Sequence, residues 1–232
     1  MSKIEIRDHP KFSNVFISGY QEKLKLYTKN AVIGKNIYGE RLINYKGLEY
    51  REWDPFRSKL AALILKNPIT NFLAEDLKCL YLGASSGTSI SHLSDIIDSG
   101  IIYGVEFAER SMRQLIQNTS ERTNIIPILG DARFPEEYAK YIFTEIDLIY
   151  QDVAQPNQAE IALSNCAYYL KNNGILIIAI KSQSIDSLQK SEYIYEKEKT
   201  ILEKAGYNII ERVNIHKYAA NHIILVVKKV FS

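Results

Sequence analysis

Residues 78–96 read KCLYLGASSGTSISHLSDI, and this stretch decides the fold. The apolar run CLYL is typical of a strand that is buried on both faces. Gly83 and Gly87 then allow a sharp turn and a close approach of the backbone to a ligand, and a helix is expected from Thr88 onward. Because a helix N-terminus presents free N–H groups, this loop is a candidate cofactor site, although a tight turn alone would also need glycine.

The same alternation of apolar runs and helical stretches continues to the end of the chain. Seven runs predict strands: KCLYLG, IIYGVE, IIPILGDA, IDLIYQDV, GILIIAI, YNIIERVNI and HIILVVKKV. Helical stretches separate all of them except the last two, which predicts parallel strands with helices on both faces of the sheet. The last two runs should form an antiparallel hairpin at one edge. The predicted fold is therefore α/β and Rossmann-like, with a mostly parallel seven-stranded sheet.

The front of the chain has a different pattern. Up to about residue 52, short pieces of alternating polar and apolar residues are separated by turn signals such as Ser18-Gly19, which predicts a small antiparallel β region. Asp54-Pro55 then resembles a helix N-cap with proline at the first helical position, so we expect a helix from there to Pro68. The sequence thus predicts a small β-rich domain over 1–52 and an α/β domain over 53–232.

Composition limits the class of protein. The 232 residues are 46% hydrophobic, enough for one sizeable core. No apolar run approaches the roughly 18 to 20 residues of a membrane span, and the start MSKIEIRDHPKF lacks the apolar stretch of a signal peptide, so we expect a cytoplasmic protein without a membrane partner. Cys79 and Cys166 have neither the number of a disulfide framework nor the spacing of a metal site, so both are expected to be buried packing residues.

Charge gives only a weak indication of a partner. The net charge is +2, but through Arg57 the chain has 11 Lys and Arg against 7 Asp and Glu, which leaves 18 against 20 for the remainder. A basic front end could meet RNA or an acidic partner, or it could simply be a solvated surface.

Acidic residues end three successive predicted strands. Glu106 follows Gly83 by 23 residues, near the roughly 20-residue spacing at which a carboxylate accepts hydrogen bonds from a ribose. Asp131 and Asp152 end the next two strands. Any one of them alone could be a helix N-cap. Because ligands of such sheets bind beyond the carboxyl ends of the strands, the three together with the glycine loop predict a nucleoside cofactor.

The loop favours a cofactor without a pyrophosphate. A dinucleotide usually needs a third glycine that packs helix against strand, whereas Thr88 follows Gly87 here, and the loop has no P-loop lysine. A nicotinamide dehydrogenase is discounted for this reason. S-adenosylmethionine has no phosphate and carries a sulfonium cation, which acidic strand ends suit electrostatically.

Six blocks of the sequence resemble the fibrillarin family, the methyltransferases of C/D guide ribonucleoprotein particles: WDPFRSKLAA, LYLGASSGTSISHLSDI, GVEF, RTNIIPILGDAR, DVAQPNQ and IKSQSID. The blocks have the family's order and spacings from about Tyr50 onward, and the front end looks like the small domain of archaeal members. The resemblance implies a class I methyltransferase fold and RNA-guided 2′-O-methylation of ribose in rRNA and tRNA. It also implies a cofactor pocket formed by Gly83, Ala84, Ser85, Ser86, Gly87, Thr88, Ser89, Glu106, Phe107, Asp131, Ala132, Gln151, Asp152, Val153 and Ala154.

The resemblance implies partners as well: a Nop-domain scaffold, a C/D guide RNA, a kink-turn-binding ribosomal-type protein and the substrate rRNA or tRNA. It further implies a catalytic Lys-Asp-Lys-His group, which falls on Lys59, Asp152, Lys181 and His222. His216 is the alternative histidine. Family members commonly have charged residues just before the histidine, where this chain has Ala219-Ala220-Asn221.

These residue types suit methyl transfer to a hydroxyl. A 2′-hydroxyl is a poor nucleophile near neutral pH, so a group must take its proton during attack, and a lysine beside a second cation can do so. Asp152 would hold one ammonium in place. We expect Lys181 to be the base or to position the hydroxyl and Lys59 to stabilise the developing oxyanion, and the sequence leaves open whether these roles are exchanged.

Two rival functions make different predictions. A methyltransferase that acts on a small molecule or a protein should have a closed apolar pocket over the strand ends instead of an open basic rim. A scaffold or RNA-binding subunit that keeps the fold without the activity should not bind S-adenosylmethionine.

Overall fold

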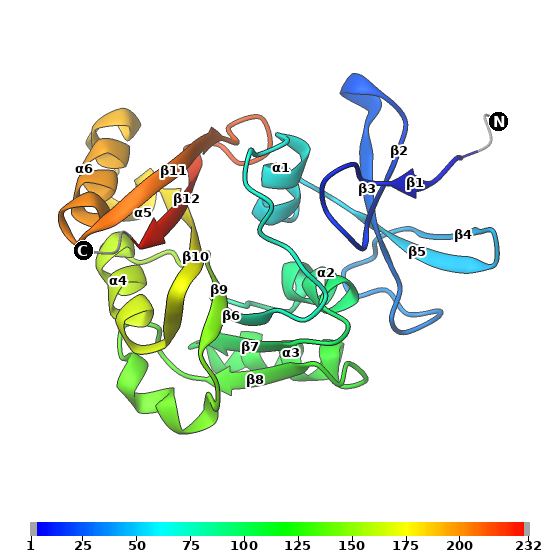
Figure 1. Ribbon diagram of the computed structural model, residues 1–232, viewed down its shortest axis with the longest axis horizontal. Coiled ribbons are helices and arrows are strands. Elements are labelled where there is room, and N and C mark those ends of the chain that lie inside the picture. The colour runs from blue at the N-terminus through cyan, green and yellow to red at the C-terminus, as the bar shows by residue number, and fades with distance from the viewer. Residues whose placement is uncertain (1–3, 230–232) are drawn as a thin grey trace.

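The computed structural model describes residues 4–229, so the first three residues of the expected N-terminal domain and the last three of the chain lie outside the described residues. The N-terminal region forms a five-stranded antiparallel sheet in the order β1-β2-β3-β5-β4, which confirms the predicted β region (Figure 1). Its elements are β1 (Arg7–Asp8), β2 (Val15–Ser18), the 3-10 helix η1 (Gln21–Lys23), β3 (Lys25–Lys29), β4 (Leu42–Tyr45) and β5 (Leu48–Trp53).

The remainder of the chain builds a seven-stranded sheet in the order β11-β12-β10-β9-β6-β7-β8. The first five strands along the chain are parallel, and β12 is antiparallel to both β10 and β11, so the predicted C-terminal hairpin is confirmed. The strands are β6 (Lys78–Leu82), β7 (Ile101–Glu106), β8 (Ile125–Leu129), β9 (Ile146–Gln151), β10 (Leu170–Lys181), β11 (Tyr207–Asn214) and β12 (His222–Lys229).

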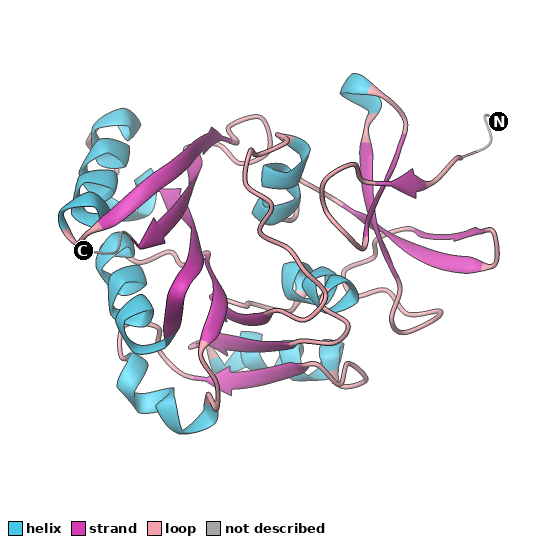
Figure 2. Cartoon of the chain, in the orientation of Figure 1, coloured by secondary structure: helices cyan, strands magenta, loops and turns pink. Residues whose placement is uncertain are grey.

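Helices cover both faces of this sheet (Figures 1 and 2). They are α1 (Lys59–Leu65), α2 (Thr88–Ile96), α3 (Glu109–Thr119), the 3-10 helix η2 (Pro135–Tyr141), α4 (Gln158–Tyr169), α5 (Ser182–Ile185) and α6 (Ser191–Lys204). None of the described helices combines the length and the apolar character needed to cross a bilayer.

Alternation along the central strand explains why both faces need a cover. Cys79 and Tyr81 of β6 pack into one core cluster with α1, α2 and α3, whereas Leu80 and Leu82 pack into the other with α4 and α6. Successive strand residues point to opposite faces, so a strand that is apolar at every position must be covered on both sides. Cys79 and Cys166 are both buried and free, which confirms their packing role.

The expected start of the first helix was wrong. The helix α1 begins at Lys59, and its N-cap is Ser58, whose hydroxyl accepts a hydrogen bond from the N–H of Ala61 at 3.3 Å. Asp54 instead closes a turn, because its carboxylate accepts from Phe56 N–H at 2.9 Å and its carbonyl accepts from Arg57 N–H at 3.1 Å. Both Asp54 and Ser58 are good cap residues, and the tertiary fold selects the second.

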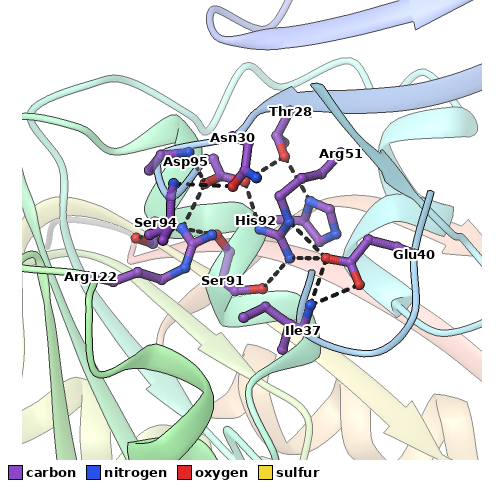
Figure 3. A network of polar contacts seen from close by, with 12 residues as sticks. Thr28, Asn30, Ile37, Glu40, Arg51, Ser91, His92, Ser94, Asp95 and Arg122 are labelled. Carbon is purple, nitrogen blue, oxygen red and sulfur yellow. Dashed lines mark hydrogen bonds and ion pairs between the residues drawn. The ribbon is translucent and has the colours of Figure 1, made fainter. Parts of the chain in front are cut away.

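A buried polar network joins the N-terminal sheet to α2 (Figure 3). Arg51 of β5 forms ion pairs with Asp95 of α2 at 2.7 Å and with Glu40 at 2.6 Å, and Arg122 contacts the other oxygen of Asp95 at 2.6 Å. The side chains of Arg51 and Asp95 are fully buried. Two cations and two anions therefore balance inside the protein, which is the condition under which buried charges are tolerated.

Candidate active site and cofactor groove

The backbone of the loop after β6 lies directly against the backbone at the end of β9. Asp152 N–H donates to the carbonyl of Leu82 at 2.9 Å. Gly83 follows with φ +84°, and a Cβ built at this position would lie 2.4 Å from the carbonyl oxygen of Asp152. Only glycine fits there, because any side chain would collide with backbone that cannot rotate away. The glycine predicted for a close approach is thus needed to bring the two strand ends together.

A cavity lies beyond the ends of β6, β7, β8 and β9, where the acidic strand ends were expected to meet. Most of the expected cofactor residues line it: Gly83, Ser85, Glu106, Phe107, Asp131, Ala132, Asp152, Val153 and Ala154. Glu106 is 7% exposed, and its two oxygens accept from Ser85 N–H at 2.8 Å and from Ala108 N–H at 2.9 Å. These bonds fix the carboxylate against the glycine loop and leave lone pairs for hydroxyls of a ligand.

Asp131 also lines this cavity. Its carboxylate pairs with Arg133 at 2.6 Å, and the hydrogen bonds from Arg133 lower the pKa of Asp131. Arg133 is therefore part of a surface ion pair. Phe107 also lines the cavity with 62% of its surface exposed, an unusual state for a large apolar ring and one that a bound aromatic ligand would relieve.

A second cavity adjoins the first. It is lined by all four residues of the expected catalytic group, Lys59, Asp152, Lys181 and His222, together with Ala84, Ser86, Thr88 and Ser89 of the loop. Five residues line both cavities: Gly83, Ser85, Asp152, Val153 and Ala154. The two cavities therefore adjoin at these residues, and we call them together the groove: carboxylates line one cavity and the Lys-Asp-Lys-His side chains line the other.

Lys59 and Asp152 form the best-defined contact of the group. The ammonium of Lys59 donates to both carboxylate oxygens of Asp152 at 2.8 Å, and the two side chains are 25% and 22% exposed. Lys59 occupies the first position of α1, which Ser58 caps, and the Ser58 hydroxyl also accepts from Ser89 at 2.8 Å. The capped helix start thus fixes the lysine over the end of β9.

Lys181 and His222 lie opposite each other on two adjacent strands. They are register partners in the antiparallel pair of β10 and β12, at the ends of both strands. His222 is 8% exposed, and its Nδ1–H donates to the carbonyl of Ala220 at 2.7 Å, which leaves Nε2 as the unprotonated nitrogen. Burial lowers the pKa of His222, and the nearby Lys59 and Lys181 lower it further. The alternative, His216, is bonded to Tyr195 and does not line the cavity.

Two expected cofactor residues, Gly87 and Gln151, line neither cavity. Gly87 is the N-cap of α2 with φ +102°, and Gln151 is fully buried, with its amide donating to the carbonyl of Gln158 at 2.7 Å. Gln158 was missed by the sequence analysis. Its side chain accepts from Lys181 N–H at 2.9 Å and so ties α4 to the end of β10 that carries the lysine.

The sequence profile of the family described as Fibrillarin matches residues 6–230. The chain belongs to the fibrillarin family. A fibrillarin-like rRNA/tRNA 2′-O-methyltransferase of Sulfolobus acidocaldarius is 46% identical over 230 residues, which cover 98% of this chain and 99% of the relative.

Two solved fibrillarins are similar in structure as well. Aeropyrum pernix fibrillarin in complex with natively bound S-adenosyl-L-methionine has a TM-score of 0.89 and 41% identity, over 98% of this chain and 100% of that one. The fibrillarin of a fibrillarin/Nop5p complex has a TM-score of 0.83 and 40% identity, over 94% of this chain and 99% of that one. The match of the chain to its relatives thus includes the N-terminal sheet as well as the groove.

Proposed function

We propose that this protein transfers a methyl group from S-adenosylmethionine to ribose 2′-hydroxyls of rRNA and tRNA. The relative at 46% identity has the name of this activity, and the solved fibrillarin at 41% identity holds the methyl donor. One observation carries the proposal for this chain: Lys59, Asp152, Lys181 and His222 line one cavity that shares its wall with the carboxylate-lined cavity beside it. The substrates named for this relative, rRNA and tRNA, are intracellular, so we also propose an intracellular location.

The residues of the groove fit S-adenosylmethionine. Glu106 has lone pairs left for ribose hydroxyls, Phe107 offers an exposed ring to an adenine, and Asp131 can accept from its amino group beside the contact with Arg133. Asp152 adds a negative charge where the two cavities join. When bound, the cofactor supplies an electrophilic methyl carbon on a sulfonium sulfur, and carboxylates stabilise such a cation.

The carboxylate of Asp152 gives the two lysines different roles. Because both of its oxygens accept from Lys59, this side chain is held where it can stabilise negative charge on the attacking oxygen. Lys181 lines the same cavity and has its backbone held by Gln158, so it is placed to position the hydroxyl for in-line attack. We therefore propose for Lys59 the role expected from the sequence, and for Lys181 the second of its two expected roles, positioning the hydroxyl.

His222 is suited to take the proton of the hydroxyl. Its Nδ1–H is used by Ala220, so the lone pair of Nε2 is available, and its lowered pKa keeps the ring neutral at pH 7. The neutral ring can therefore act as general base in the transferring step, and the two neighbouring ammonium groups disfavour its protonation before the attack.

The pH dependence of the single-turnover rate tests this role. Because the folded pKa of His222 lies below 6.5, the active neutral form is lost as the pH falls below that value, so the rate should fall there and stay level above it. In a His222→Ala variant this limb should be absent and the rate at pH 7 lower by about 10²-fold. A wild-type rate that rises only above pH 7.5 would reject His222 as the proton acceptor.

Cofactor binding should depend on the close approach at Gly83. In Gly83→Ala the added Cβ would meet the carbonyl of Asp152, so we expect S-adenosylmethionine to bind at least ~10-fold more weakly in calorimetric titration. Gly206→Ala is the matched control, because Gly206 has the same φ of +84° but nothing within 4 Å of its Cβ. Equal affinities of the two variants would contradict the role assigned to the contact between the strand ends.

We propose that the chain works within a particle and not alone. The solved complex of a fibrillarin with Nop5p supports a Nop-domain scaffold as the partner, and the family resemblance adds a C/D guide RNA and a kink-turn-binding protein. The net charge of +2 supports this dependence, since unaided RNA binding usually needs a strongly basic face.

Reconstitution tests this proposal. Radiolabelled methyl transfer to one target nucleotide should require the scaffold and the guide RNA, and the protein alone should show little site selection. If the protein alone labels the same nucleotide with the same yield as the complete particle, the proposal that it works within a particle is rejected. No label under any condition, together with no binding of S-adenosylmethionine, would favour the inactive-subunit rival instead.

The proposed division of the chain at residues 52 and 53 is one of architecture. It falls within β5, before the last residue of that strand, at the C-terminal end of the N-terminal sheet. Phe12, Leu26 and Trp53 share a core cluster with α1 and α2, and Arg51 is paired with Asp95, so we expect both parts to unfold in one transition.

A further inference from the structure

A second groove lies beside the active-site cavity. It is enclosed by η1, β3, the end of β5, α1 and the loop between β11 and β12, and this loop lies next to α1 in Figure 1. Phe56 and Tyr218 line this groove, whereas the next residues in the chain, Arg57 and Ala219, line the active-site cavity. We call it the flanking groove. The flanking groove and the active-site cavity therefore adjoin at two places in the chain, between residues 56 and 57 and between residues 218 and 219.

An aromatic pair stands at this boundary. The rings of Phe56 and Tyr218 contact each other edge to face, with centroids 5.3 Å apart and an interplanar angle of 69°. Phe56 is 65% exposed, yet its backbone is fixed by the hydrogen bond to the carboxylate of Asp54. A rigid, exposed aromatic surface at the mouth of a polar site is suited to contact a sugar or a base of an incoming strand.

The charge around the pair favours an anionic occupant. Among the side chains that the structure describes there, three lysines line the flanking groove, Lys23, Lys25 and Lys217, against the two carboxylates Glu52 and Asp54. Lys25 neutralises Glu52 at 2.6 Å. Arg57 adds a further cation at the boundary with the active-site cavity. The groove thus joins an apolar platform to a surplus of positive charge, a combination that matches the sugar-phosphate backbone of RNA.

Continuity with the active site identifies which part of an RNA would lie there. This step rests on the proposed function, because a target ribose in the active-site cavity belongs to a chain that must leave that cavity. We propose that the flanking groove binds the ribose-phosphate backbone of the nucleotides next to the target on one side. Phe56 and Tyr218 contact a ribose or base there, and the lysines contact the phosphates.

The test uses Phe56→Ala and the double variant Lys23→Ala/Lys217→Ala in the reconstituted guide particle. Each should raise KM for the target RNA by about 10-fold and leave kcat within about 2-fold, since the contacts are made before and during the reaction alike. The affinity for S-adenosylmethionine should not change. The matched controls are Phe143→Ala, whose ring is 78% exposed in the loop before β9, and Lys204→Ala at the end of α6. Both should behave like the wild type.

A shortened target RNA identifies the contacted nucleotides. Removing the nucleotides on the bound side should raise the wild-type KM by about the same 10-fold factor. With this shortened RNA, Phe56→Ala should have the same KM as the wild type. If the two losses multiply instead, Phe56 does not contact those nucleotides and the proposal fails.

The remaining outcomes are also decisive. If the wild type methylates RNA and Phe56→Ala matches Phe143→Ala, the flanking groove is not an RNA site, although the proposed function stands. If Phe56→Ala instead prevents assembly with the scaffold in gel filtration, a protein occupies the groove and the proposal is overturned. If the wild type methylates no RNA in any particle, the proposed function itself has failed.

Discussion

An Asp152→Asn variant should lose at least ~100-fold of the single-turnover methylation rate in a reconstituted guide particle. The substitution keeps the shape of the side chain but removes the charge that binds the ammonium of Lys59 through both oxygens at 2.8 Å. Lys59 is then free to move away from the end of β9. Asp152 is also the only acidic residue of the Lys-Asp-Lys-His group, so the two lysines near His222 lose that counter-charge. Positioning and transition-state stabilisation are therefore lost together.

The control for this variant lies on the same strand. Asp147→Asn changes the same side chain at the opposite end of β9, where Asp147 pairs with Lys171 and accepts from Lys78 N–H. It should keep a rate within about 3-fold of the wild type, because that end of the sheet does not meet the substrate. Calorimetry should show that Asp152→Asn still binds S-adenosylmethionine. A rate near that of the wild type would contradict the assignment of Asp152.

The largest loss of stability is expected from Asp95→Asn. This change leaves Arg51 and Arg122 without their shared carboxylate inside the protein, so the free energy of unfolding should fall by about 3–5 kcal/mol in urea denaturation. The side chain is replaced by one of equal size, so the loss cannot come from a cavity. Unfolding should still follow one transition, because the core cluster that Phe12, Leu26 and Trp53 share with α1 and α2 remains in the variant.

A surface pair provides the comparison for this stability measurement. Glu109→Ala removes the partner of Arg113 in an exposed i,i+4 pair at 3.6 Å, and it should change the free energy of unfolding by less than about 0.5 kcal/mol. A loss below about 1 kcal/mol for Asp95→Asn would show that the buried network is not needed to hold the two sheets together.

Much of the fold could be predicted because its signals are local. The run CLYL followed by Gly83 and Gly87 specifies a buried strand, a sharp turn and a helix within about ten residues, and the same logic holds for each later unit. The C-terminal hairpin followed from the absence of a helix between two apolar runs. Glu106 and Asp131 were expected to come together because parallel strands end at the same edge of the sheet.

The errors and omissions have a common cause in long-range contacts. Ser58, and not Asp54, caps α1. The sequence offers two good cap residues in this segment and does not distinguish them, whereas in the folded protein the contact of Ser58 with Ser89 favours Ser58. Arg51 and Asp95 are 44 residues apart in the sequence, and hydrophobic periodicity does not predict such a long-range ion pair. The grouping of the four catalytic candidates came from the family resemblance, since each lysine or histidine alone is typical of a solvated or structural residue.

The most direct test of the central claim is single-turnover transfer of a labelled methyl group to two RNAs that differ at one atom. Both carry the same guide-complementary sequence, and one has a 2′-deoxyribose at the target nucleotide. The proposed function predicts label on the target nucleotide of the RNA with the hydroxyl and none on its deoxy counterpart. Equal labelling of the two RNAs, or label on a base or on protein, would contradict it.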